Sequence, residues 1–144
     1  MYASILVPVD GSSHSRHALK VAVHLLDDED GTLHLLNVQE RPPARDTLGH
    51  LAGAPAADAD EAVQQSGRAV LDELRDDLEL ASERVRFAVR AGRPSAIISA
   101  EAARLGVDAI VLGSRGAGDI GSLVMGSVSR RVLHEAQCRV IVVR

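Results

Sequence analysis

Residues 107–116 of the chain are Val-Asp-Ala-Ile-Val-Leu-Gly-Ser-Arg-Gly, an apolar run followed at once by a glycine-rich turn. A short apolar run bounded by turn residues predicts a buried strand. Glycine lets backbone N–H groups come close to an anion, because it has no Cβ and adopts positive φ without penalty. The stretch therefore predicts a buried strand that ends in an anion-binding loop.

A second motif, Gly-Ser-Val-Ser, occupies residues 126–129. Ser127 and Ser129 open a run from Val128 to Ala136 that can be helical. Their hydroxyls and the first free N–H groups of such a helix would point at the same anion as the loop. Together the two motifs predict a phosphate site, and hence a nucleotide ligand.

Two better-known phosphate motifs overlap this region. Residues 116–121 match GxGxxG, but that dinucleotide fingerprint belongs in a first strand-to-helix turn with an acidic residue further on. Residues 121–126 have the GxxxxG spacing of a P-loop, yet Ser127 stands where the phosphate-binding Lys belongs. A glycine-rich surface loop without a ligand remains the alternative.

Length and composition restrict the class of protein. A chain of 144 residues predicts one domain, residues 1–144. Aromatic residues make up 1% of the chain and its net charge is −4, which argues against a nucleic-acid partner. No apolar run approaches the length of a membrane span, and the start does not resemble a signal peptide, so we expect a cytoplasmic protein that does not enter membranes.

Apolar runs and helical periodicities alternate along the chain. The predicted strands are residues 4–9, 32–38, 84–90, 107–112 and 138–143, and the predicted helices follow the first four of them. This order predicts an α/β fold with a parallel, doubly wound sheet covered on both faces. Arg84, Arg86 and Arg90 alternate with apolar residues, which is typical of an edge strand, where they either bind a partner or block aggregation.

Asp58 followed by Glu61 resembles a capping box at the start of the second helix. The third helix is expected to begin near Pro94 and to stop at Gly106.

Ligands of such sheets lie beyond the carboxyl ends of the strands, where the strand order reverses. A strand order of 3-2-1-4-5 would place this point between the first and fourth strands. Asp10 ends the first and Gly113 ends the fourth, so we expect the two turns to face each other across one crevice.

Over nearly its whole length the sequence resembles the universal stress protein family. The matching stretches are residues 5–12 with Ser15, Ala18 and Leu19, then Gly92 and Pro94, residues 108–116, residues 126–129 and residues 140–143. Gly113, Gly116, Gly126 and Ser127 fit the motif of the family's ATP-binding branch. The resemblance implies a single-domain, Rossmann-like five-stranded sheet of order 3-2-1-4-5. It also implies a homodimer through Cys138–Val143, with further association left open.

The resemblance also implies roles for individual residues. Asp10 would bind the nucleoside end of ATP, between aliphatic walls formed by Pro8, Val38 and Leu112. Gly113 and Gly116 would approach the ribose and phosphate. The phosphates would be held through backbone N–H groups and hydroxyls of Gly126, Ser127, Val128 and Ser129. Mg²⁺ would accompany the phosphates, with few protein ligands.

The resemblance thus implies an ATP-binding regulatory protein of the stress response that acts through nucleotide-dependent partner interaction. No dedicated catalytic residues and no protein metal site are expected. Two alternatives stay open. One is weak ATP hydrolysis or autophosphorylation on Ser127 or Ser129. The other is an interaction module that binds AMP or no nucleotide, which Asp119 favours because a carboxylate repels phosphate.

Overall fold

The computed structural model describes residues 1–40, 56–115 and 125–144, and of residues 56–60 it describes the backbone. Gly116, Asp119 and the connection of residues 41–55 lie outside this description. The strands are β1 (Ser4–Pro8), β2 (Thr32–Gln39), β3 (Val85–Ala91), β4 (Ala109–Gly113) and β5 (Arg139–Val143). The α-helices are α1 (Ser13–Leu25), α3 (Ala56–Arg75), α4 (Pro94–Leu105) and α5 (Ser127–Glu135). A 3₁₀ turn, η2 (Ser82–Arg84), precedes β3.

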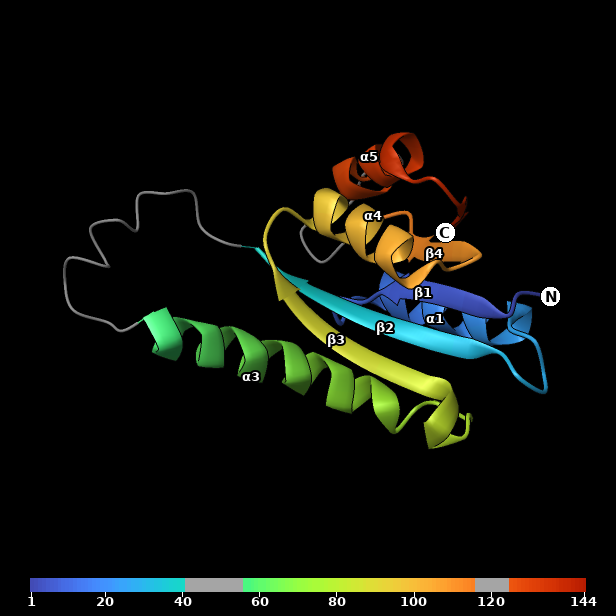
Figure 1. The fold of residues 1–144 in the computed structure, drawn as a ribbon, viewed down its shortest axis with the longest axis horizontal. Coiled ribbons are helices and arrows are strands. Elements are labelled where there is room, and N and C mark those ends of the chain that lie inside the picture. The colour runs from blue at the N-terminus through green and yellow to red at the C-terminus, as the bar shows by residue number, and fades with distance from the viewer. Residues whose placement is uncertain (41–55, 116–124) are drawn as a thin grey trace.

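All five strands pair in parallel, in the order β3-β2-β1-β4-β5 (Figure 1). The predicted fold class and strand order are therefore confirmed. The predicted edge strand is also confirmed, because β3 ends the order on one side, but it begins at Val85 and Arg84 lies in η2 instead. β1 is flanked by β2 and β4, so the order reverses beside it, and the carboxyl ends of β1 and β4 are neighbours.

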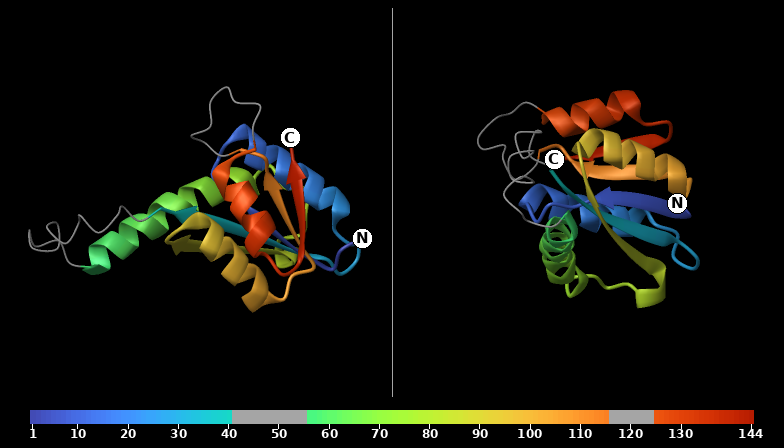
Figure 2. Two further views of the ribbon diagram at one scale, coloured as in Figure 1. Left: turned by 90° about the horizontal axis from the view of Figure 1, so that it is seen from above. Right: turned by 60° about the vertical axis from the view of Figure 1, so that its left-hand side comes forward.

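Helices cover both faces of the sheet in two layers (Figures 1 and 2). The helices α1 and α3 lie on one face, and α4 and α5 lie on the other. Each layer has its own aliphatic core. Ile5, Val7 and Val111 point to the α1 side, while Leu6, Ile110 and Leu112 point to the α4 side. Central strands buried on both faces explain why the sequence shows continuous apolar runs here.

Local signals set several helix ends. Pro94 is the first residue of α4, and Gly106 ends it in the left-handed region at φ 64°. Both ends were predicted. In contrast, α3 begins at Ala56, so the predicted capping box of Asp58 and Glu61 is wrong. An acidic residue is favourable anywhere in the first turn because of the helix dipole, and this makes Asp58 a poor marker of the first residue.

The two faces of β3 differ. Val85 and Val89 are buried against α3, whereas Phe87 on the same face keeps 39% of its surface exposed. The guanidinium of Arg75 lies 5.9 Å from the Phe87 ring centroid. Arg86 and Arg90 project from the other face and are exposed. The edge strand therefore presents one aromatic ring and two arginines near the open side of the sheet.

Candidate functional site

A cleft of about 460 Å³ opens at the carboxyl ends of β1, β2 and β4. Its walls are aliphatic, formed mainly by Pro8, Leu36, Val38, Ile98 and Leu112. Polar groups gather at its rim: Asp10, Ser15, Glu40, Arg115, Ser127 and Ser129. A cleft of this size with a few polar groups on apolar walls is typical of a small-molecule site. Its place at the reversal of strand order is the place where α/β sheets bind ligands.

The turn from β1 to α1 is built by three consecutive residues. An Asp10 carboxylate oxygen accepts a hydrogen bond of 2.9 Å from the Ser12 N–H. Gly11 takes a φ of 81°, which L-residues with a side chain rarely adopt. Ser12 caps α1, its hydroxyl accepting from the Ser15 N–H at 3.2 Å. The turn thus fixes the Asp10 backbone and leaves its side chain exposed at the rim of the cleft.

The glycine loop is closed at its base. The Gly126 N–H donates to the Ser114 carbonyl at 2.7 Å, and the Ser114 N–H donates to the Val143 carbonyl at 2.7 Å. These two bonds hold the start of α5 beside the ends of β4 and β5. The two sequence motifs, although far apart in the chain, therefore meet at Ser114 and Gly126.

Gly113 and Ser129 are close partners. The Ser129 hydroxyl donates to the Gly113 carbonyl at 2.8 Å, and Ser129 is 3% exposed. A Cβ on Gly113 would lie 2.8 Å from the backbone carbon and the Cβ of His14. The sequence predicted that both residues face the phosphates. In this structure the absence of a side chain at Gly113 lets α1 pack on β4. The Ser129 hydroxyl donates its hydrogen bond to the Gly113 backbone.

The rim of the cleft is electrostatically divided. Glu40 follows β2 and Asp10 follows β1, whereas Arg115 follows β4. The start of α5 also lies on the β4 side, and its N-cap residue, Gly126, provides no side-chain cap. The first N–H groups of a helix carry partial positive charge. Because β2, β1 and β4 are successive neighbours in the sheet, carboxylates stand on one side of the cleft and positive charge on the other.

Nine of the ten site residues predicted from sequence line this one cleft: Pro8, Asp10, Val38, Leu112, Gly113, Gly126, Ser127, Val128 and Ser129. The tenth, Gly116, lies outside the described residues. The sequence did not single out Glu40, Pro94 or Ile98 as site residues. Glu40 directly follows β2 and Pro94 starts α4, so the rule that ligands meet the carboxyl edge of the sheet could have found both.

Fold and cleft define a doubly wound, Rossmann-like α/β protein with a cleft at its topological switch point. The universal stress protein family model matches residues 1–144. Universal stress protein YxiE of Bacillus subtilis is 30% identical over 148 aligned residues, which cover 100% of both chains. The chain belongs to the universal stress protein family.

Solved structures agree with this assignment. Universal stress protein UspA from Lactobacillus plantarum is 30% identical, with a TM-score of 0.68 over 99% of this chain and 98% of that one. A universal stress protein crystallised in complex with cAMP shares the fold at 21% identity, with a TM-score of 0.67 over 99% of this chain and 97% of that one.

Neither a membrane-spanning helix nor a cluster of metal ligands occurs among the described residues. None of the helices seen in residues 1–40, 56–115 and 125–144 has the length and apolar character needed to cross a membrane. Across the same ranges, no group of three or more His, Cys, Asp or Glu side chains is placed to hold a metal ion.

Proposed function

We propose that this protein binds ATP in the cleft between β1 and β4 and acts as a non-catalytic regulator of the stress response. The carrying observation is a cleft with aliphatic walls that has carboxylates after β1 and β2 and positive groups after β4 and at the start of α5. A nucleotide has the matching order of groups: hydroxyls and amines that donate hydrogen bonds, a flat apolar base, and phosphates. The cAMP complex of a relative with the same fold supports an adenine nucleotide as the ligand.

The residues of the cleft fit this ligand by their chemistry. Asp10 and Glu40 accept hydrogen bonds from ribose hydroxyls or the adenine amine. Val38 and Leu112 contact the base. The N–H groups of Ser127, Val128 and Ser129 at the uncapped start of α5, with Arg115, bind the phosphates. When bound, Mg²⁺ neutralises phosphate charge and takes most of its remaining ligands from water.

Binding rather than catalysis is proposed because of the chemistry at the phosphate side. The Ser129 hydroxyl already donates a hydrogen bond to the Gly113 carbonyl. The carboxylates that line the cleft, Asp10 and Glu40, follow β1 and β2, whereas Ser127 and Ser129 lie in the first turn of α5. Within the part of the chain that the structure describes, no hydrogen bond joins either carboxylate to a serine hydroxyl of α5, as a general base would require. ATP would therefore persist in the cleft and change a surface that a partner protein recognises. We place this activity in the cytoplasm.

We also propose a homodimer in which β5 of one copy pairs with β5 of another. β5 ends the strand order on the side opposite β3. Val140, Ile141, Val142 and Val143 are each partly exposed in the single chain, so an apolar strand edge is available for pairing. Sedimentation of the protein and of an Ile141→Lys variant tests this. A dimer that becomes monomeric supports β5 pairing, and a wild-type monomer contradicts it.

Two substitutions, each of which removes one charge, test the opposite charges at the two sides of the cleft. Asp10→Asn keeps the turn, because an amide oxygen also accepts from Ser12, but removes the charge. Arg115→Gln removes a positive group from the phosphate side. In calorimetric titrations, Arg115→Gln should weaken ATP much more than adenosine, and Asp10→Asn should weaken both alike. Arg139→Gln, an exposed arginine at the amino end of β5, serves as the control. Equal losses of affinity for ATP and for adenosine in Arg115→Gln would contradict the proposal that the phosphates lie beside Arg115.

A further inference from the structure

A second hollow lies on the same face of the sheet as α4, between that helix and the edge strand β3. Its volume is about 320 Å³. The floor includes Leu36 and Ala88, and its charged or titratable lining residues are His34, Arg86, Arg90, Glu101 and Arg104. We call it the β3 groove. None of these five residues takes part in the cleft described above.

One buried carboxylate organises the positive groups of the β3 groove. Glu101 has only 8% of its side chain exposed. It accepts hydrogen bonds from Arg104 at 2.6 Å and 3.2 Å and from Arg90 at 3.2 Å. Both guanidiniums stay accessible, with 43% and 59% of the Arg90 and Arg104 side chains exposed. Glu101 therefore fixes Arg90 and Arg104 in the lining of the groove, while both guanidiniums remain accessible to solvent.

Arg86 adds a third arginine to the lining of the β3 groove, on the same face of β3 as Arg90, and its guanidinium donates to the Glu83 carbonyl at 2.7 Å. The lining therefore holds three guanidiniums and one carboxylate, an excess of positive charge on a chain whose net charge is −4. Arg86 and Arg90 are four residues apart along a strand, a span of about 13 Å. Only the small side chain of Ala88 stands between them on this face. The two positive charges of β3 therefore lie in a row along the strand.

The edge of β3 is the second feature. Among the described strands, β3 pairs with β2 alone, so its outer backbone groups face away from the sheet. Side chains donate to two β3 carbonyls: Arg90 at 3.0 Å and Gln64 at 3.4 Å to that of Val89, and Arg86 at 3.4 Å to that of Val85. A segment that pairs with this edge would replace these side-chain bonds with backbone bonds and so release the guanidiniums for its carboxylates.

An extended segment that pairs with this edge would place its side chains opposite those of β3, alternately on the two faces. On one face they would meet Arg86 and Arg90. On the other they would meet Phe87, whose ring is partly exposed.

We propose that the β3 groove and edge bind an extended acidic segment of a partner protein, in which carboxylates alternate with apolar residues. Carboxylates pair with the accessible guanidiniums in a bidentate geometry, and backbone hydrogen bonds to β3 supply the register. The same arginines repel basic segments and offer nothing to neutral ones. The arginines therefore protect the edge from indiscriminate strand addition and select the acidic partner.

The test uses the full-length protein and a fluorescein-labelled peptide of alternating Glu and Val, followed by fluorescence anisotropy at low salt. The control peptide carries Gln in place of Glu. The Glu peptide should bind and the Gln peptide should not, and binding should fall as salt rises. Arg86→Gln and Arg90→Gln should each weaken binding about fivefold, the effect of losing one accessible charge pair. Arg68→Gln, an exposed arginine of α3 on the other face of the sheet, should leave binding unchanged.

Amide resonances give an independent measurement on the unmodified protein. Binding should shift the signals of β3 and leave those of α5 in place. Absence of binding would overturn the proposal, as would equal binding of the two peptides. An equal loss of peptide affinity in Arg68→Gln and Arg86→Gln would also overturn it. Displacement of the peptide by equimolar inorganic phosphate would show a site for small anions instead.

Discussion

The Ser129 hydroxyl donates a 2.8 Å hydrogen bond to the carbonyl of Gly113, which joins the first turn of α5 to the end of β4. This bond connects the two halves of the glycine motif, which residues 117–125 separate in the sequence. It holds the first turn of α5, whose residues Ser127, Val128 and Ser129 line the cleft. In the proposed ATP complex the hydroxyl would therefore position the start of α5 rather than contact a phosphate itself.

Ser129→Ala should lower the free energy of unfolding by about 1 kcal/mol, the typical net contribution of one hydrogen bond. Ser127→Ala is the matched control, because Ser127 is exposed two positions earlier in the same helix. It should change stability by less than about 0.5 kcal/mol. Urea unfolding of both variants measures this. Equal losses would show that the Ser129 bond has no special role in holding α5.

Gly67 lies in the middle of α3, where glycine is otherwise unfavourable. A Cβ at this position would meet the Val89 methyl carbons at 2.4 Å and 2.7 Å, and the Asn37 amide oxygen at 3.0 Å. Its absence lets α3 approach β2 and β3. Gly67→Ala should therefore destabilise the protein by about 1–2 kcal/mol, because overpacking outweighs the gain in helix propensity.

Thermal unfolding checks this against Ser66→Ala, an exposed neighbour in the same helix. Ser66→Ala should be neutral or slightly stabilising. A more stable Gly67→Ala protein would mean that α3 does not pack on the sheet at this distance.

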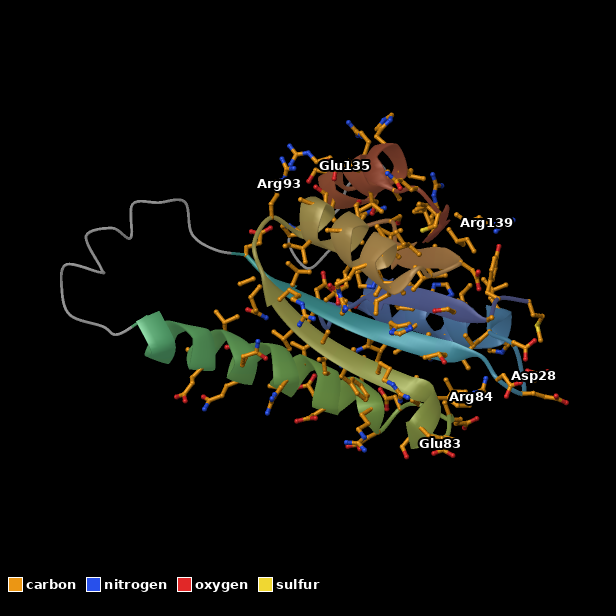
Figure 3. All side chains as sticks on the ribbon, in the orientation of Figure 1. Asp28, Glu83, Arg84, Arg93, Glu135 and Arg139 are labelled. Atoms are coloured by element: carbon orange, nitrogen blue, oxygen red, sulfur yellow. The ribbon has the colours of Figure 1, made fainter. Side chains whose placement is uncertain are left out.

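Arg84 anchors the loop between α1 and β2 from a distance in sequence. Its guanidinium donates to the carbonyls of Gly31 at 2.9 Å and Asp28 at 2.8 Å, and also to that of Asp27. Figure 3 shows Arg84 beside Asp28, with Glu83 next to it on η2. Lys cannot reproduce this fork of donors.

Arg84→Lys should thus cost about 1–3 kcal/mol, since it leaves carbonyl groups without their charged donor. Glu83→Gln at the adjacent exposed position should have little effect. Chemical denaturation compares the two. A loss confined to Glu83→Gln would contradict this account of the loop.

His34 gives the protein a specific pH dependence. Burial lowers the pKa of its imidazole below 6.5, and the nearby Arg86 lowers it further, against the opposing effect of Glu101. As pH falls, the unfolded chain therefore takes up this proton before the folded one. The His34 contribution to stability is present above pH 6.5 and is lost as pH falls through the folded pKa.

The free energy of unfolding should accordingly begin to decrease as pH falls below about 7, at a pH above ordinary carboxyl titration. In His34→Gln this part of the decrease should disappear. Parallel stability curves for the two proteins would refute the assignment to His34.

Most of the fold was predictable because its signals are local. Continuous apolar runs identified the strands, and Pro94 and Gly106 marked both ends of α4. Asp10 and Gly113 were placed at one crevice because parallel topology brings the carboxyl ends of β1 and β4 together. This inference needed the strand order 3-2-1-4-5, which the family resemblance implied, but not the details of packing.

Other features depend on contacts that no local pattern encodes. The glycines at positions 67 and 113 are required by Val89 and His14, which are remote in sequence. The Glu101 cluster needs β3 and α4 to lie side by side before its arginines converge. The start of α3 was misplaced because acidic residues are acceptable throughout a first turn.

The most direct measurement for the central claim is calorimetric titration of the protein with ATP, ADP and AMP in the presence of Mg²⁺. The divided cleft predicts saturable binding of one ATP per chain, with affinity falling from ATP to AMP as phosphates are removed from the Arg115 and α5 side. No heat of binding at millimolar ATP would contradict nucleotide binding. Affinity that rises from ATP to AMP would contradict the assigned phosphate side.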